Sequence, residues 1–401
     1  MIINKEEKYR KKRNYLLQLC TLKQSYAGPL VIVNFSNMMK PIPFLALLLV
    51  ACSPAKGPDA SAPSLTFTVD PFWPKPLPNN WILGQVAGVA VDSLDHVWII
   101  HRPLSITAEE AGAVQNPPLG ECCVPAPPVI EFDAEGNVVQ AWGAQDSTQR
   151  WPKTEHGIFI DANRNVWVGG NNAEDQVVLK YSANGKLLLQ IGEWGITRGS
   201  NDSLHLGRPA DMAVDLPANE VYVADGYGNR RVIVFDAMTG AYKRHWGAYG
   251  SVPVDGALAP YDPSAPVSKS FANPVHSVVL SNNGLLYVAD RTNNRIQVFQ
   301  KNGTFEMEGI VASQTRSMGA AWDLTLSGDA GQKYVYLADG VNKKVWILTR
   351  SDLRVVGSFG RGGRQAGQFG WVHNIAMDSK GNLFTAEVET GKRIQKFHPT
   401  E

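Results

Sequence analysis

One short alternating segment recurs six times along this chain of 401 residues, and this repetition constrains the fold more than any other feature. Within each copy the apolar residues alternate, a spacing that predicts a strand with one buried face. The copies start 46 to 69 residues apart, at residues 88–92, 157–161, 211–215, 277–281, 323–327 and 374–378. Such self-similarity predicts a fold built from six copies of one small unit.

The residues after each segment predict what the unit is. A turn such as Ser379–Asn382 and a second β-rich run such as Leu383–Ala386 come next, followed by a third run and usually by a fourth that ends on Trp-Gly, Ile-Gly or Phe-Gly. No apolar pattern at the 3.6-residue spacing of a helix intervenes. We therefore predict an all-β fold, a six-bladed β-propeller with four-stranded antiparallel blades around a central channel.

The two ends of the repeat region predict how the ring closes. The last blade ends at Phe397 without a fourth strand, while Leu65–Val69 is a β-rich run that is not assigned to any blade. Pairing these two runs would complete the sixth blade. The propeller is accordingly expected to occupy residues 65–401.

The residues before the propeller resemble an export signal. Met39 and Lys40 precede an apolar run from Pro41 to Ala51, which is too short to span a bilayer core of roughly 30 Å. The sequence Leu49–Cys52 resembles the lipobox of bacterial lipoproteins and predicts a lipid on Cys52. A buried hydrophobic segment is the alternative interpretation.

This interpretation divides the N-terminal region into three parts. Residues 1–38 would precede the natural start, residues 39–51 would form the signal peptide, and residues 52–64, rich in Pro, Ala and Ser, would form a flexible tether. We expect a protein of the bacterial cell envelope, on its periplasmic or extracellular face, that meets the membrane only through its lipid anchor. Because 38 Lys and Arg balance 37 Asp and Glu, we expect no nucleic-acid partner. We also expect a monomer.

Histidine recurs at one position of the repeat. The residues directly before the six segments are Ala87, His156, Ala210, His276, Trp322 and His373. In a propeller the first strands line the channel, and alternate blades lie about 120° apart, so the three imidazoles should converge. Three His ligands with one free position are typical of catalytic zinc. Alternatively, each histidine is bonded separately to the backbone.

Two arginines and a tyrosine follow the second runs. Arg102 and Arg291 stand at matching positions in opposite blades, and Tyr227 lies one position further along in blade three. Guanidinium groups suit the capture of a carboxylate or the stabilisation of an oxyanion, and a phenol near a metal can act as a base. Surface ion pairs and ordinary aromatic packing are the alternatives.

Two family resemblances follow from these motifs. The Asp-Gly-Asn-like turns and the run Ala289–Phe299 resemble NHL-repeat propellers over nearly all of residues 81–398, which implies a fold but not a function. Seven further motifs together resemble the peptidyl-α-hydroxyglycine α-amidating lyase family: Gly84–Asp92, His101-Arg102, His156-Gly157, Asp225–Asn229, Val275–Ser277, Ala289–Arg291 and Val372-His373.

The second resemblance implies an activity and a set of site residues. That family splits peptidyl-hydroxyglycine into a peptide amide and glyoxylate, with zinc held by three His. It implies His156, His276 and His373 as zinc ligands, Tyr227 as the base, and Arg102 and Arg291 as substrate-binding and charge-stabilising groups. It also implies a structural calcium in the channel, held by the main-chain carbonyls of Val89 and Ile158 and by a carboxylate after the last His.

The chain departs from the family pattern at four positions. Asn374 takes the place of the calcium-binding carboxylate, and Trp371 replaces a Met two residues before the last His. Gly228 and Tyr287 stand where cysteines are expected, so the disulfides of the family are absent. An insertion at residues 105–129, which could cover the channel, contributes Cys122 and Cys123, either as a vicinal disulfide, as metal ligands or as a local clip.

These observations lead to one main hypothesis and two alternatives. The main hypothesis is a zinc-dependent lyase that releases an amide and glyoxylate from a small peptide or another α-hydroxy-amide substrate. The first alternative is a non-catalytic, envelope-anchored propeller that binds a protein, peptide or glycan. The second, a calcium-dependent lactonase-like propeller, would need channel carboxylates, and the repeat position directly before the six segments offers His, Ala and Trp instead.

Overall fold

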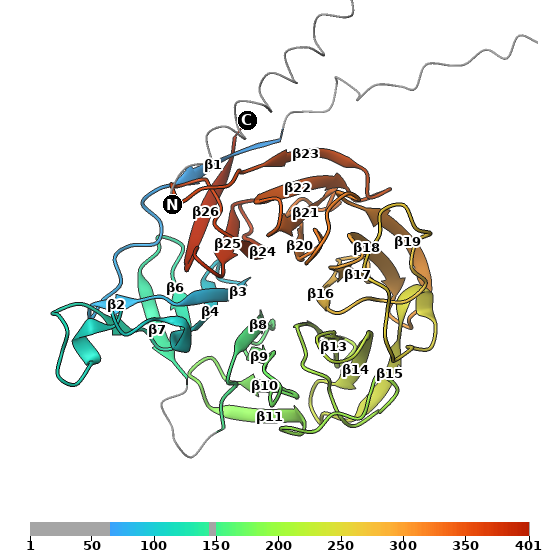
Figure 1. Ribbon diagram of the computed structural model, residues 1–401, viewed down its shortest axis with the longest axis horizontal. Coiled ribbons are helices and arrows are strands. Elements are labelled where there is room, and N and C mark those ends of the chain that lie inside the picture. The colour runs from blue at the N-terminus through green and yellow to red at the C-terminus, as the bar shows by residue number, and fades with distance from the viewer. Residues whose placement is uncertain (1–64, 144–149, 401) are drawn as a thin grey trace, which may run out of the picture. The chain divides into compact units, whose positions relative to one another are not determined.

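Six four-stranded antiparallel sheets are arranged around a central axis, as the sequence repeat predicts (Figure 1). The computed structural model describes residues 65–143 and 150–400. The predictions for residues 1–64, including the lipid on Cys52, lie outside this part of the chain. Within it, no helix is long and apolar enough to cross a membrane.

The four strands of each blade run in order from the axis to the rim. The first strands are β3 (Gln85–Val91), β8 (Glu155–Ile160), β12 (Asp211–Asp215), β16 (Val275–Leu280), β20 (Asp323–Leu326) and β24 (Val372–Met377). The second strands are β4 (Val97–Arg102), β9 (Val166–Gly170), β13 (Glu220–Asp225), β17 (Leu285–Asp290), β21 (Tyr334–Asp339) and β25 (Leu383–Glu387). Neighbouring first strands contact one another around the whole ring, so their side chains define the channel.

The outer half of each blade is equally regular. The third strands are β6 (Val129–Phe132), β10 (Val177–Tyr181), β14 (Arg231–Asp236), β18 (Arg295–Gln300), β22 (Lys344–Thr349) and β26 (Arg393–Thr400). The fourth strands are β7 (Val138–Trp142), β11 (Leu187–Gly192), β15 (Tyr242–Trp246), β19 (Phe305–Ile310), β23 (Val355–Phe359) and, in blade six, β1 (Thr66–Asp70). Each strand is antiparallel to its neighbours in the blade, as in a β-meander.

The predicted closure of the ring is confirmed. Strand β1 pairs with β26 from Thr66 opposite Thr400 to Asp70 opposite Lys396. The start of the propeller therefore supplies the outer strand of the blade that its end builds. With β1 in place, blade six has four strands like the other five blades, and the ring is closed.

The closing strand also packs on blade five, which makes its contribution to stability measurable. The Phe67 ring lies 5.4 Å from that of Tyr336 and 4.9 Å from that of Phe359. We expect Phe67→Ala to lower the free energy of unfolding by about 2 kcal/mol, because the side chain is half-buried. Urea denaturation would measure this loss. Thr68→Ala, on the exposed face of the same strand, should change little, and equal losses in both variants would contradict the assignment.

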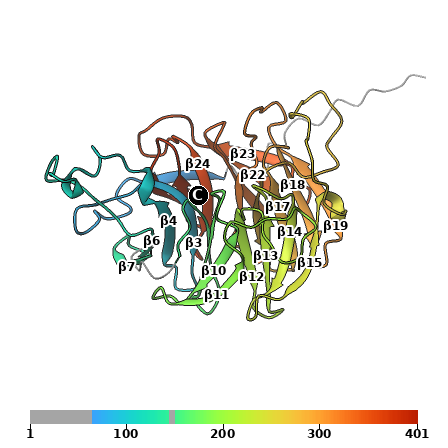
Figure 2. The ribbon, with the colours of Figure 1, turned by 60° about the horizontal axis from the view of Figure 1, so that its bottom comes forward.

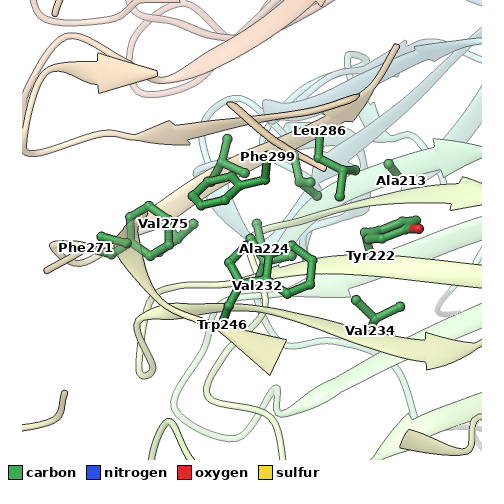
Figure 3. Close-up of a cluster of buried hydrophobic side chains, with 13 residues drawn as sticks. Ala213, Tyr222, Ala224, Val232, Val234, Trp246, Phe271, Val275, Leu286 and Phe299 are labelled. Carbon is green, nitrogen blue, oxygen red and sulfur yellow. The ribbon is translucent and has the colours of Figure 1, made fainter. Parts of the chain in front are cut away.

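Hydrophobic side chains fill the space between neighbouring blades. Figure 3 shows one such cluster, in which Trp246 and Val232 of blade three face Phe299 of blade four. The Trp-Gly ending of a blade packs on a turn of the next one: a Cβ atom at Gly303, where φ is +91°, would lie 2.9 Å from the Trp246 ring. The turn glycine is therefore required both by its φ angle and by the tryptophan beside it.

The insertion in blade one does not cover the channel, contrary to our expectation. It contains the short helices η1 (Pro103–Ser105) and η2 (Gly112–Val114) and a disulfide between Cys122 and Cys123, while η3 (Ala248–Gly250) lies in blade three. Parallel pairing of β2 (Trp81–Ile82) with β5 (Val124–Pro125) fixes its base, and Lys392 bonds Glu110 at 2.6 Å. Figures 1 and 2 both show it extending outward from blade one, away from the axis.

Candidate metal centre

The three predicted histidines lie at the start of three first strands. His156 belongs to β8, His276 to β16 and His373 to β24, and at each of them the register with the second strand shifts. Such β-bulges leave a residue out of the pairing and re-aim its side chain. The same local irregularity, which blade one also has between Val86 and Gly88, accompanies each of the three imidazoles that turn toward the axis.

These residues, which we call the histidine cluster, meet at one point. One ring nitrogen of each lies within 4.8 Å of the corresponding nitrogens of the other two. The ring centroids are 4.8 to 4.9 Å apart with edge-to-face orientations. All three side chains are buried. The convergence that the sequence predicted is present, while the role of the cluster as a zinc site stays a prediction.

Backbone carbonyls fix the orientation of every ring. The Nδ1 atom of His156 lies 2.7 Å from the oxygen of Ala210, that of His276 lies 2.6 Å from the oxygen of Trp322, and that of His373 lies 2.7 Å from the oxygen of Ala87. The three carbonyls belong to the blades between the histidines, at the same repeat position. A carbonyl only accepts, so each Nδ1–H donates and each Nε2 keeps a lone pair.

Burial keeps the cluster uncharged. Desolvation is the main cause that lowers the pKa of all three histidines, and it takes the pKa of His373 to about 3. The charge of Arg102 lowers the pKa of His373 further, and Arg291 does the same for His276. At neutral pH the rings are therefore neutral, which is the form that binds a metal.

The donor set of the cluster fits a zinc ion. Three neutral imidazoles with their Nε2 lone pairs directed to one point are a common zinc-binding arrangement, and zinc in such sites keeps one position for a further oxygen. The Tyr227 hydroxyl lies beside that point, 2.9 Å from Nε2 of His156 and 3.2 Å from Nε2 of His276. The structure thus brings a phenol to the predicted metal position.

A rigid loop holds Tyr227 there. Asp225 accepts hydrogen bonds from the Gly207 amide at 2.7 Å, from the Asn229 side chain at 2.8 Å and from Arg231 at 2.9 Å. A Cβ atom at Gly226 would lie 2.0 Å from the Val275 carbonyl oxygen, so only glycine lets the loop pass this close to β16. The buried Asp225–Arg231 pair and this close approach together fix the tyrosine over the axis.

The two predicted arginines lie around the tyrosine. Arg291 donates to the Tyr227 hydroxyl at 3.3 Å, and its guanidinium stacks 4.3 Å from the Trp322 ring centroid. Arg102 donates to the main-chain oxygen of Glu155 and to the side chain of Gln85, both at 2.8 Å. Burial lowers the pKa of both guanidinium groups, and the nearby tyrosine raises it. Both still carry a positive charge at neutral pH.

The sequence analysis missed two further residues beside this site. The guanidinium of Arg208 lies 5.6 Å from the Tyr227 ring centroid and donates to the Asn171 carbonyl at 2.8 Å. The ammonium of Lys343 lies 3.5 Å from the ring centroid of Trp371. A signal in the sequence could have identified Arg208, because it stands two residues before the repeat position of the histidines, as Trp371 does in blade six.

The surroundings of the histidine cluster are therefore cationic and aromatic. Arg102, Arg208 and Arg291 lie around it, and Trp371 packs edge-on against Trp322 with 5.6 Å between ring centroids. Three guanidinium groups near one buried point favour an anionic ligand, above all a carboxylate that can accept paired hydrogen bonds. The tryptophans limit the space beside it.

The calcium implied by the family resemblance does not fit the residues proposed for it. The amide oxygen of Asn374 accepts the Val89 N–H at 2.6 Å, and the side chain is neutral. Val89 and Ile158 line the channel, yet they bring no charge to it. Calcium sites rely on carboxylate charge for affinity, so these three residues do not make one.

Two carboxylates nevertheless lie in the channel. Asp211 and Asp323 directly follow the ring of residues that contains the histidines, in blades three and five. The same repeat alignment could have found them one position later. A different acidic group, Asp92 and Glu131 with His96, already holds the guanidinium of Arg164.

Comparisons with known proteins agree with the fold. The NHL repeat model matches residues 206–235 and 275–299. A solved structure described as a streptogramin B lyase covers 83% of the chain with a TM-score of 0.50, at 12% sequence identity. At that identity the likeness shows the fold alone.

Curated relatives carry two kinds of name. The chain is 26% identical over 352 residues to peptidyl-alpha-hydroxyglycine alpha-amidating lyase 1 of Drosophila melanogaster, covering 83% of this chain and 60% of that protein. It is 29% identical over 255 residues to peptidylglycine alpha-amidating monooxygenase of Rattus norvegicus, covering 62% of this chain and 24% of that protein. The chain is 27% identical over 353 residues to NHL repeat-containing protein 3 of Mus musculus, covering 83% of this chain and 84% of that protein.

The chain thus has NHL repeats, the six-bladed propeller and homologues named amidating lyase, at modest identity. It spans only part of the amidating relatives, about a quarter of the rat protein and three fifths of the fly protein. NHL repeat-containing protein 3 of Mus musculus, which the chain matches over most of both lengths, has a name that states no activity.

Proposed function

We propose that this propeller is a zinc-dependent lyase of the amidating type, which cleaves the C–N bond of an α-hydroxyglycine-like substrate to release an amide and glyoxylate. One observation carries the proposal, the place of the Tyr227 hydroxyl beside the histidine cluster. It lies 2.9 Å from Nε2 of His156 and 3.2 Å from Nε2 of His276, and it accepts a hydrogen bond from Arg291. The amidating-lyase names of several homologues support the same reaction.

The substrate class follows from the groups around the cluster. An α-hydroxyglycine derivative carries a carboxylate, a hydroxyl and an amide nitrogen on or next to one carbon. Arg102 and Arg291 are suited to its carboxylate because guanidinium groups bind that group through paired hydrogen bonds. The zinc held by His156, His276 and His373 would supply Lewis-acid polarisation of a substrate oxygen.

Tyr227 is suited to move the proton. As a phenolate it takes the proton from the α-hydroxyl, the C–O bond becomes a carbonyl, and the electrons of the C–N bond leave with the amide nitrogen. The same proton then passes to that nitrogen, so the products are the amide and glyoxylate and the phenolate is restored. The bond from Arg291 at 3.3 Å stabilises negative charge on the phenol oxygen.

The test combines metal analysis with product detection. We would purify the full chain without added metal, measure its zinc content and follow glyoxylate release from an N-acyl-α-hydroxyglycine. We expect about one zinc per chain, and glyoxylate and amide formed in equal amounts. Folded protein that takes up no metal when zinc is supplied would overturn the proposal, as would zinc-loaded protein that forms no glyoxylate.

A second function has one observation in its favour. The match to NHL repeat-containing protein 3 extends over 84% of that protein, further than the match to the fly lyase. A non-catalytic propeller that binds a protein, peptide or glycan would fit this likeness, with the histidine cluster as a structural element. Metal-free, folded and inactive protein in the experiment above is the result that would favour it.

A further inference from the structure

Arg208, in the segment that leads into β12, has a backbone conformation that arginine rarely adopts. Its φ angle is +65°, in the left-handed region where side chains other than that of glycine are under strain. Such conformations persist only where the surrounding structure enforces them, and they are common at ligand-binding sites. The strain therefore draws attention to what this residue contributes beside the histidine cluster.

Main-chain hydrogen bonds join Arg208 to the residues of the site. Its carbonyl accepts the Tyr227 N–H at 3.2 Å. Two residues further along, the Ala210 carbonyl lies 2.7 Å from Nδ1 of His156. The backbone of Arg208 thus belongs to the framework that holds the tyrosine and one of the histidines, and this framework fixes the point from which its side chain starts.

The guanidinium of Arg208 lies beside the phenol ring. Its central carbon is 5.6 Å from the centroid of the Tyr227 ring, and that of Arg291, from blade four, is 5.7 Å from the same centroid. The Nε atom of Arg208 donates to the Asn171 carbonyl of blade two at 2.8 Å. Among residues 65–143 and 150–400 this is the one hydrogen bond that its side chain makes, so both terminal nitrogens are available to a ligand.

No carboxylate of the described residues pairs with any of the three guanidinium groups around the cluster, those of Arg102, Arg208 and Arg291. By contrast, the buried Arg231 and Arg295 each pair with an aspartate, at 2.9 and 2.7 Å. Two arginines can already hold one carboxylate through paired hydrogen bonds, so the third has charge and donors for a second anionic group. This count favours a ligand with two carboxylates.

We propose that Arg208 binds a second carboxylate, carried by the acyl part of the substrate. The substrate class, which rests on the proposed function, is then an N-acyl-α-hydroxyglycine with an acidic acyl group. Its α-carboxylate binds Arg102 and Arg291, and its acyl carboxylate binds Arg208. Trp322 and Trp371 stand in blades five and six, so an acyl group directed away from these rings meets Arg208 in blade three.

Ligands that cannot react separate this binding from the reaction. N-succinylglycine carries two carboxylates and N-acetylglycine carries one, and both lack the α-hydroxyl group, so neither can be cleaved. We would measure the Kd of each for the full chain, supplied with zinc, by calorimetry. We expect N-succinylglycine to bind about 10- to 100-fold more tightly, the usual effect of hydrogen bonds to a charged group. Arg208→Gln should remove this preference and leave the Kd of N-acetylglycine unchanged.

Two further variants distinguish ligand binding from an effect on the fold. Arg208→Lys keeps the charge without the paired hydrogen bonds and should retain part of the preference. Arg354→Gln, at an exposed arginine in the turn between β22 and β23, should retain all of it. Tm and zinc content should stay at the wild-type values in all three variants, because Tyr227 bonds the main chain of residue 208 and not its side chain.

Three results would overturn the inference: equal Kd values for the two ligands in the wild type, a preference that survives in Arg208→Gln, or an equal loss of affinity for both ligands in that variant. Glyoxylate release from N-succinyl-α-hydroxyglycine, measured on the same samples, reports separately on the proposed function. Wild-type protein that prefers N-succinylglycine but forms no glyoxylate would contradict the lyase reaction and would support Arg208 as the ligand of a second carboxylate.

Discussion

Replacing His156, His276 or His373 with alanine should release the zinc and abolish glyoxylate formation. Each variant removes one of three predicted ligands whose nitrogens lie within 4.8 Å of one another and leaves only two imidazoles. From the free energies of zinc sites, the loss of one ligand should weaken binding by about 10² to 10³-fold. Elemental analysis after dialysis against a weak chelator would measure the loss.

The three variants should behave alike because a main-chain carbonyl of the next blade holds Nδ1 of each ring in the same way. In each case the alanine also leaves one carbonyl, of Ala210, Trp322 or Ala87, without its imidazole partner. His245→Ala provides the control, since that residue lies on the outer strand β15 and its side chain, among the described residues, bonds only the Tyr242 hydroxyl. Retention of stoichiometric zinc by any one of the three variants would contradict the predicted site.

The fold could be predicted from the sequence because the apolar pattern, the turn residues and the number of copies all indicate the same architecture. Alternation predicts strands, turn residues separate them, and six copies predict six blades. Even the closure was accessible, since Phe67 and its neighbours form a β-rich run with no other partner. The position of the insertion after Arg102 was not predictable from the sequence. The insertion is held in part by the ion pair between Glu110 and Lys392, which are 282 positions apart in the chain.

Those site residues were predictable whose position in the repeat determines where they lie in the propeller. His156, His276 and His373 converge because first strands line the channel, and this needs only the register of the repeat. The bulges that aim them and the carbonyls that orient them come from backbone geometry, which the sequence pattern does not encode. Asp211 directly follows the repeat position of the histidines, so the same register of the repeat also places it in the channel.

Tyr227→Phe should lower kcat by about 10² to 10⁴-fold, the usual contribution of a general base, while the zinc content stays at the wild-type value. The substitution removes only the hydroxyl that lies 2.9 Å from His156 and 3.3 Å from Arg291. The ring, its contact with Arg208 and the loop held by Asp225 remain. KM should change little, because substrate binding is assigned to Arg102 and Arg291.

Steady-state kinetics with an N-acyl-α-hydroxyglycine, beside metal analysis of the same samples, would separate the role of Tyr227 from that of the histidines. Loss of kcat with full zinc identifies a proton-transfer group, whereas joint loss of zinc and kcat would make the hydroxyl a metal-positioning group. Tyr261→Phe is the matched control, because its exposed hydroxyl bonds the Ser313 carbonyl in a loop far along the chain. A Tyr227→Phe enzyme with the kcat of Tyr261→Phe would rule out the phenol as the base.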